Sequence, residues 1–257
     1  MFLNRKYHVL KKMNYFSDQR GIFERYILEY EGWSKHIQKT KEIIEKNATL
    51  IKNDSCAILG SGWLIDVPID FLSKYFKKVY LFDIIHPVQV KHKIKNYNNV
   101  ELVEIDITGG AIQEFYDSVQ MFKHYKKRKE LSEIVMKGFS FPLEFDYVVS
   151  VNILSQLDQM LSEYLKKYNL YSKEELIVIK KMIQQKHLDT LPKEKSCLIT
   201  DYYEYVYDDN NNLEIKNNII YIELPFSKLI DKWTWEFDHH NYYPGKNIVF
   251  EVLAFNL

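Results

Sequence analysis

The chain has 257 residues, of which 46% are hydrophobic and 27% are charged, as expected for a globular protein with a sizeable core. Lysine plus arginine and aspartate plus glutamate number 35 each, so the formal net charge is zero. This balance argues against a nucleic-acid partner held by a strong positive field. Most of the 20 tyrosines are expected to pack in the core.

The two cysteines, Cys56 and Cys197, each lie in an apolar run that predicts a central strand. Both are therefore expected to be buried thiols. The first six residues lack the continuous apolar segment of a signal peptide. No apolar run reaches the ~18 residues that a membrane-spanning helix needs. We therefore expect a cytoplasmic protein with no membrane partner.

Residues 1–47 are predicted to be helical, because apolar side chains recur near a 3.6-residue period. The recurring positions include Ile22, Tyr26, Tyr30 and Trp33. We interpret this segment as an N-terminal helical extension that packs on the domain of residues 48–257 or forms a lid over its pocket. Arg25 and Trp33 are candidates for closing that pocket, and simple packing is the alternative.

From residue 55 onward, predicted strands and helices alternate. Strands are expected at 55–59, 78–82, 100–105, 145–151 and 196–200, and helical segments at 66–76, 86–96, 112–138, 157–169 and 173–187. This alternation predicts a parallel sheet with helices on both faces. After residue 201 the pattern predicts a β-hairpin from 202–208 and 219–224, followed by strands at 233–237 and 248–255.

A glycine turn follows the first predicted strand, at Gly60-Ser61-Gly62. Glycines there let a ligand approach the backbone closely, although a tight turn alone also needs glycine. A dinucleotide fingerprint would carry a third glycine near Ile65, and that glycine is missing. A nucleoside without phosphates tolerates this departure better than a dinucleotide does.

Carboxylates close the second and third predicted strands, at Asp83 and Asp106. The carboxyl ends of parallel strands form the ligand crevice of an open α/β sheet. Asp83 is therefore a candidate for accepting hydrogen bonds from ribose hydroxyls. Asp106 could accept one from an adenine amino group, with the Ile107 backbone donating to a ring nitrogen. The alternative is that each caps the segment that follows it.

Four segments carry a family resemblance: AILGSGWLIDVP, VYLFDI, VELVEIDIT and FDYVVSVNILSQL. Together they resemble the first four motifs of class I S-adenosylmethionine-dependent methyltransferases, over about residues 50–257. The resemblance implies a Rossmann-like, mostly parallel seven-stranded sheet with an antiparallel last strand. It also implies S-adenosylmethionine as cofactor. The implied cofactor contacts are Gly60, Ser61, Gly62, Asp83, Ile84, Asp106, Ile107 and Asn152.

Two features depart from the family pattern. The third glycine is absent, and the chain carries insertions near 109–144 and 202–225, which are expected to form a family-specific substrate region. Polar residues Asn152, Ser155 and Gln156 follow the fourth strand and should face the crevice, unless they only begin a helix. Nucleic-acid amino-methyltransferases carry an Asp/Asn-Pro-Pro-aromatic motif at this point, which this chain lacks. We therefore expect a small-molecule acceptor.

The histidines are acid–base candidates because their charge changes near neutral pH. His239 and His240 are the expected catalytic residues, since they lie in the final loop beside two tyrosines. His36, His86 and His187 are further candidates. No cluster has the spacing of metal ligands.

Three alternatives to a methyltransferase stay open at this point. An aminopropyl transferase on the same scaffold would favour a more acidic pocket, and an NAD-linked enzyme would favour the third glycine. A non-catalytic nucleoside-binding module is the third possibility. The sequence does not indicate the oligomeric state.

Overall fold

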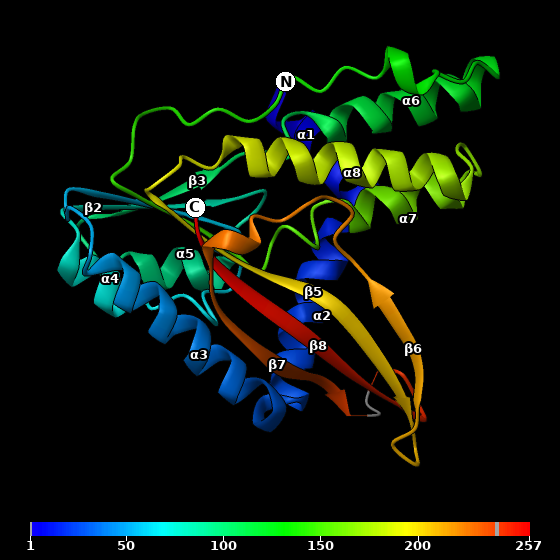
Figure 1. The fold of residues 1–257 in the computed structure, drawn as a ribbon. Helices are drawn as coiled ribbons and strands as arrows, with labels where there is room; N and C mark the ends of the chain where they lie inside the picture. The colour runs from blue at the N-terminus through cyan, green and yellow to red at the C-terminus, as the bar shows by residue number, and fades with distance from the viewer. Residues whose placement is uncertain (1, 240–241) are drawn as a thin grey trace.

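A computed structural model describes residues 2–239 and 242–257 of the chain (Figure 1). Its helices are α1 Phe2–Lys12, α2 Tyr15–Leu28, α3 Tyr30–Ala48, α4 Ile69–Tyr75, α5 Val88–Ile94, α6 Ala111–Tyr125, α7 Gln159–Lys167 and α8 Lys173–Thr190. Its strands are β1 Ser55–Leu59, β2 Lys78–Asp83, β3 Val100–Glu104, β4 Tyr147–Val151, β5 Ser196–Asp208, β6 Leu213–Asn218, β7 Leu229–His239 and β8 Lys246–Asn256. Two short 3-10 turns lie at Leu131–Glu133 and Phe226–Lys228.

The strands form one sheet in the order β3-β2-β1-β4-β5-β8-β7, with β6 paired to β5 outside this path. Strands β3, β2, β1, β4 and β5 pair in parallel with one another. The last strand, β8, lies antiparallel between β5 and β7. The predicted Rossmann-like, mostly parallel α/β fold with an antiparallel last strand is thereby confirmed, but among the described residues the sheet has eight strands rather than the predicted seven, because β6 adds a further strand beside β5.

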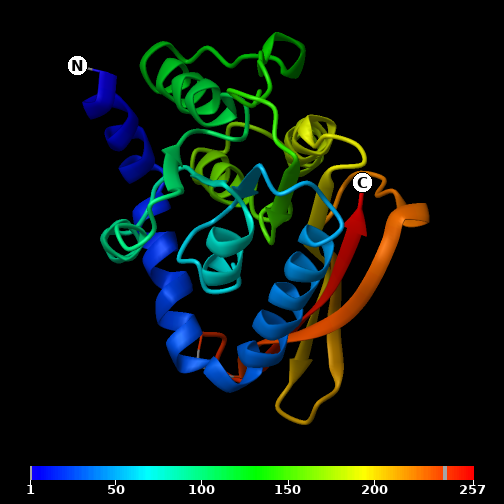
Figure 2. The same ribbon diagram turned by 90° about the vertical axis from the view of Figure 1, so that its left-hand side faces the viewer.

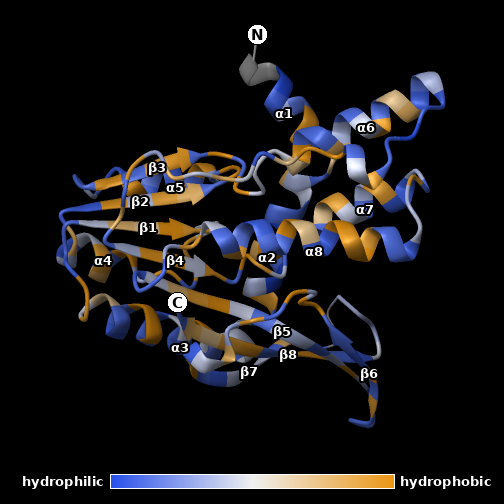
Figure 3. Cartoon of the chain, turned by 45° about the horizontal axis from the view of Figure 1, so that its top comes forward, coloured by the Kyte–Doolittle hydropathy of each residue, from blue (hydrophilic) through white to orange (hydrophobic). Residues whose placement is uncertain are grey.

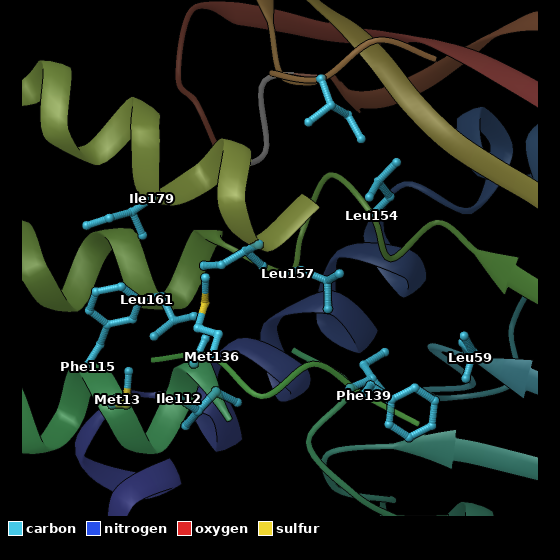
Figure 4. Packing of buried hydrophobic residues seen from close by; sticks show 14 of the residues in the cluster. Met13, Leu59, Ile112, Phe115, Met136, Phe139, Leu154, Leu157, Leu161 and Ile179 are labelled. Atoms are coloured by element: carbon cyan, nitrogen blue, oxygen red, sulfur yellow. The ribbon is translucent and has the colours of Figure 1, made fainter. Parts of the chain in front are cut away.

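Helices cover both faces of the sheet (Figure 1). The alternation of side chains along β1 explains why. Ala57 and Leu59 belong to the core cluster that α1, α6, α7 and α8 cover, part of which Figure 4 shows. Cys56 and Ile58 belong to the cluster under α3, α4 and α5. Because both faces are buried, the central strands are rich in hydrophobic residues, whereas the helices alternate hydrophilic and hydrophobic positions (Figure 3).

The two cysteines are buried and unbonded, as predicted: Cys56 lies in β1 and Cys197 in β5. Within the described part of the chain, none of the helices combines the length and the apolar character that crossing a membrane requires.

The predicted hairpin after residue 201 is partly wrong. Strand β5 does not end at Asp201 but continues to Asp208, and its partner is β6 rather than residues 219–224. Strand β6 is exposed along its whole length and has only two apolar residues, Leu213 and Ile215, so it lacks the apolar run by which the buried strands were recognised. Residues 219–224 instead insert Ile220, Ile222 and Leu224 into the core, where Gln184 bonds the backbone at Ile219 and Tyr221.

The long helix predicted at 112–138 is also too long. Helix α6 ends at Tyr125, where Lys126 adopts a positive φ of 56°. Four consecutive basic residues begin at Lys126, and a continued helix would bring Lys127 beside Lys123 as an unfavourable i,i+4 pair of like charges. Two of them pair with carboxylates, Arg128 with Glu175 and Lys129 with Glu114. The following segment buries Ile134, Met136 and Phe139 in the core without forming a helix.

The N-terminal segment forms three helices. Helix α3 packs on β7 and β5, and α2 and α3 meet in a V in Figure 2. Residues Ile43, Ile44 and Ala48 of α3 are buried in the core. The segment is therefore integrated with the sheet through α3.

Candidate functional site

A cavity of about 460 Å³ opens at the carboxyl ends of the parallel strands. Ligand sites of proteins with open α/β sheets lie at this edge. The cavity is lined by all eight of the predicted cofactor contacts: Gly60, Ser61, Gly62, Asp83, Ile84, Asp106, Ile107 and Asn152. Segments separated by up to about 90 residues in sequence thus meet around one space. Their role in binding stays a prediction.

The two glycines of the turn have different structural roles. Gly60 has φ of +80°, and a Cβ there would lie 2.7 Å from Ile153 Cβ. Packing against Ile153 is therefore enough to explain why residue 60 is a glycine. Gly62 has φ of +42°, but the nearest atom to a Cβ there is Asp83 Oδ2 at 3.9 Å. The space beside Gly62 is therefore open for a ligand.

Asp83 is held against the glycine turn by backbone donors. The Gly62 N–H donates to Oδ2 at 2.8 Å, and the Ile84 N–H donates to Oδ1 at 2.7 Å. Burial raises the pKa of Asp83 to about 6, while these backbone hydrogen bonds act in the opposite direction. Oδ1 also accepts the Ile85 N–H at 3.5 Å. Because each carboxylate oxygen has two lone pairs, Oδ2 is the oxygen that can still accept a hydrogen bond from a ligand hydroxyl.

Asp106 serves the local backbone and also lines the cavity. Its Oδ1 accepts hydrogen bonds from the Thr108 N–H at 2.9 Å and from Thr108 Oγ1 at 2.5 Å. Oδ1 of Asp106 therefore caps the segment that follows it, which is the alternative role expected from the sequence. Burial raises the pKa of Asp106, and the bonds to Thr108 oppose that shift. Ile107 is buried beside it.

Asn152 follows β4 with a positive φ of 48°, a conformation that asparagine tolerates better than most residues. Its Nδ2 donates to Asp66 Oδ2 at 2.6 Å and lies 3.0 Å from His36 Nε2. Its Oδ1 is buried and has no partner in the described part of the chain. A buried polar atom of this kind is unusual and indicates a missing ligand or solvent contact.

His36 lies beneath this asparagine and is neutral. Its Nδ1 accepts a hydrogen bond from Trp233 Nε1 at 3.1 Å, and its ring stacks on Trp235 at 3.9 Å. Burial lowers the pKa of His36 to about 3. At neutral pH the side chain therefore lies against Asn152 without adding charge to the cavity.

Trp63, the bulky residue after Gly62, ties helix α2 to the glycine turn. Its Nε1 donates to the Gln19 carbonyl at 2.7 Å, and its ring stacks on Phe23 at 4.3 Å. Gln19 Nε2 in turn donates to the Ile85 carbonyl beyond β2. Helix α2 also contributes residues to the cavity lining, including Arg25. The N-terminal segment therefore forms part of the site's wall.

The side of the cavity under β5, β7 and β8 carries residues to which the sequence reasoning gave no role. They are Asp66, Asp201, Glu204, Trp235, Phe237 and Phe250. Asp201 is only 3% exposed, and its Oδ2 accepts a hydrogen bond from Ser155 Oγ at 3.1 Å. A carboxylate at the end of a predicted strand was the available signal for Asp201, the same signal that marked Asp83.

Of the two histidines expected to be catalytic, only His239 is among the described residues, and it does not line the cavity. His239 Nδ1 lies 2.9 Å from Glu29 Oε2, and His239 is absent from the cavity wall. His240 lies outside the described residues. His86 and His187 are buried against serine hydroxyls, Ser61 at 3.0 Å and Ser150 at 2.8 Å, and burial lowers the pKa of each to about 4.

No group of three or more histidine, cysteine or acidic side chains in residues 2–239 and 242–257 is arranged to hold a metal ion.

No protein-family model and no curated protein matches this sequence. Among solved structures, it is similar to the N-methyltransferase NodS from Bradyrhizobium japonicum WM9 in complex with S-adenosyl-L-homocysteine, at 9% identity, covering 84% of this chain and 85% of that one, with a TM-score of 0.38. The 1,6-didemethyltoxoflavin-N1-methyltransferase from Burkholderia thailandensis is 8% identical, with 93% and 87% covered and a TM-score of 0.44. The 23S rRNA methyltransferase ErmE is 12% identical, with 84% and 68% covered and a TM-score of 0.34.

These similarities are too distant to assign an activity to this chain. Its own strand order and antiparallel last strand give it the Rossmann-like fold that the motifs of class I methyltransferases implied.

Proposed function

We propose that this protein transfers a methyl group from S-adenosylmethionine to a small-molecule acceptor. One observation carries the proposal. Gly62, Asp83 and Asp106, which come from the ends of three adjacent parallel strands, line the same cavity. An open approach to the backbone beside two successive carboxylates is the arrangement that a nucleoside needs.

The residues present fit this cofactor. The open space at Gly62 lets a ligand lie against the turn, with Asp83 accepting from the ribose hydroxyls and Asp106 and Ile107 meeting the adenine. The unpartnered Asn152 Oδ1 offers an acceptor for the cofactor's ammonium group. When bound, S-adenosylmethionine supplies an electrophilic methyl carbon on a sulfonium.

The protein's own part would be to bind, orient and exclude water. A wall of α2 residues closes over the turn through the Trp63 contacts, so the N-terminal helices act as a cover for the cavity. Holding two reactants in one enclosed geometry removes much of the entropic cost of their reaction. We propose the same division that the sequence indicated, with residues 1–47 as cover and residues 48–257 as catalytic domain.

The net charge of the chain and the volume of the cavity both support a small-molecule acceptor. The chain has no net positive charge to attract a polyanion. The cavity of about 460 Å³ lies in the usual range for small-molecule sites.

A second candidate is an aminopropyl transferase, and one observation favours it. The cavity wall is rich in carboxylates, which would suit a polyamine acceptor. Both candidates use a sulfonium donor and differ in whether that donor keeps its carboxylate.

Isothermal titration with three ligands tests the proposal. We expect S-adenosylmethionine to bind, with NAD and the decarboxylated form of S-adenosylmethionine binding at least tenfold more weakly. Tighter binding of the decarboxylated donor would favour the aminopropyl transferase. Binding of none of the three would leave a structural role or another ligand as the better interpretation.

A further inference from the structure

We propose that the acceptor is an amine and that Asp201 takes up its proton. This inference rests on the proposed function and adds the acceptor class. The strand order separates two halves of the cavity. Asp83 and Asp106 lie at the ends of β2 and beyond β3, whereas Asp201, Trp235 and Phe250 belong to β5, β7 and β8 on the other side of β1 and β4. The second half is therefore the place for the acceptor.

Asp201 is a buried carboxyl group with an unused oxygen. Its side chain has one hydrogen bond, from Ser155 Oγ to Oδ2, while Oδ1 is buried without a partner among the described residues. Burial, with a smaller contribution from the charge of Asp66, raises the pKa of Asp201 to about 7. A buried carboxyl oxygen without a hydrogen bond destabilises the fold unless a donor reaches it. An ammonium N–H is a donor of the required kind.

The charges around the cavity favour a cation. Its described wall contains seven acidic residues and two basic ones. The acidic residues are Asp18, Asp66, Asp83, Asp106, Asp158, Asp201 and Glu204. Of the basic residues, Lys180 pairs with Asp158 at 3.0 Å, and the Arg25 guanidinium lies over the rings of Phe237 and Tyr242 at 4.6 and 4.2 Å. An anionic acceptor would meet a surplus of like charge.

Aromatic side chains complete this half of the wall. Trp33 and Trp235 pack edge to face at 4.8 Å, and Phe237 and Phe250 do so at 4.7 Å. The faces of such rings attract cations, and indole rings do so most strongly. The Arg25 guanidinium already lies over the Phe237 ring, so the rings available to the acceptor are those of Trp33, Trp235 and Phe250. His36 stacks on Trp235 but is neutral, so it does not oppose this attraction.

The proton balance is simple. The ammonium nitrogen gives one proton to Asp201 Oδ1 and regains a lone pair, which forms the new N–C bond to the methyl group. The C–S bond breaks with its electrons on sulfur, so the donor leaves as a neutral thioether. Atoms and charges balance without any further reactant.

Calorimetric titration with matched probes tests the inference. The wild-type protein is titrated, with and without S-adenosylhomocysteine, with 2-phenylethylamine, 2-phenylethanol and 3-phenylpropionate, and with the corresponding indole series (tryptamine, tryptophol and indole-3-propionate). We expect the amine of at least one series to bind at least tenfold more tightly than its alcohol and its carboxylate. The inference is wrong if an alcohol or carboxylate binds as tightly, or if neither amine binds.

Asp201→Asn should weaken amine binding at least tenfold and leave the affinity for S-adenosylhomocysteine unchanged. Asp117→Asn, which removes an exposed carboxylate on α6, is the matched control and should change neither affinity. Equal amine affinity in Asp201→Asn and wild type would overturn the role of Asp201. If Asp201→Asn does not fold, the wild-type comparison still decides the acceptor class. Failure of S-adenosylhomocysteine to bind would count against the proposed function separately.

Discussion

Replacing Asp201 by asparagine should stabilise the protein, and more so as the pH rises. Burial raises the pKa of this carboxyl from 3.8 to about 7, so the folded state favours its neutral form. In the unfolded chain the group ionises at its ordinary pKa. Folding at a pH above 3.8 therefore requires either proton uptake or the burial of a charge. Asparagine has nearly the same shape, can still accept from Ser155 Oγ, and never ionises.

The size of the effect follows from the two pKa values. For folded and unfolded pKa values of about 7 and 3.8, linkage gives a penalty of roughly 2 kcal/mol at pH 5 and roughly 4 kcal/mol at pH 8. The free energy of unfolding of Asp201→Asn, relative to wild type, should thus rise by about 2 to 3 kcal/mol between these pH values. Any constant effect of the substitution cancels in this difference.

Urea unfolding followed by circular dichroism at pH 5 and pH 8 measures this difference. Asp117→Asn serves as the control because its carboxylate is exposed, and its stability relative to wild type should change little between the two pH values. The reasoning would be refuted if the difference in free energy of unfolding between Asp201→Asn and wild type did not change with pH. It would also be refuted if the wild-type protein became more stable relative to the variant as the pH rises.

Four further predictions concern the cofactor side of the cavity. Asp83→Ala should weaken S-adenosylmethionine binding at least tenfold, about 1.4 kcal/mol by calorimetry, and an unchanged affinity would contradict the assignment. Gly60→Ala should lower the urea midpoint more than Gly62→Ala, because only the first creates a clash, with Ile153 Cβ. Gly62→Ala should keep the circular dichroism spectrum of a folded protein but bind the cofactor at least tenfold more weakly. Undiminished binding would contradict the proposed contact between the glycine turn and the cofactor. Trp63→Ala should speed hydrogen exchange throughout α2, since it removes the hydrogen bond and the ring stack that fix that helix; unchanged exchange would show that other contacts hold α2.

The parallel half of the sheet and its ligand edge were predictable because each signal is local. Buried β1 and β4 are continuous apolar runs, and the glycine turn and Asp83 follow directly after β1 and at the end of β2. Strand β6 gave no such signal, because all of its residues are exposed and its pairing with β5 depends on contacts across the hairpin.

The acceptor side was harder to predict because its residues become neighbours only through the fold. Trp235 reads as an ordinary strand residue, and only the approach of α3 brings His36 and Trp33 against it. His239 was expected to be a base from its side-chain chemistry alone. The sequence does not show that the fold brings its ring within hydrogen-bond distance of Glu29. Asp201 carries the same strand-end signal as Asp83, but tertiary burial decides that its Oδ1 has no hydrogen-bond partner among the described residues.

The missing third glycine and the bulky turn have a common structural explanation, which also bears on the choice of ligand. In dinucleotide sites the helix begins at the turn, and its N-terminus faces the pyrophosphate. Here Trp63 packs against α2, Leu64 adopts a positive φ of 58°, and α4 begins only at Ile69. In the described part of the chain, no helix N-terminus therefore adjoins Gly62 to stabilise phosphate charge, whereas the backbone and Asp83 remain available to a nucleoside. A ligand that carries a sulfonium in place of phosphates suits this turn better than NAD does.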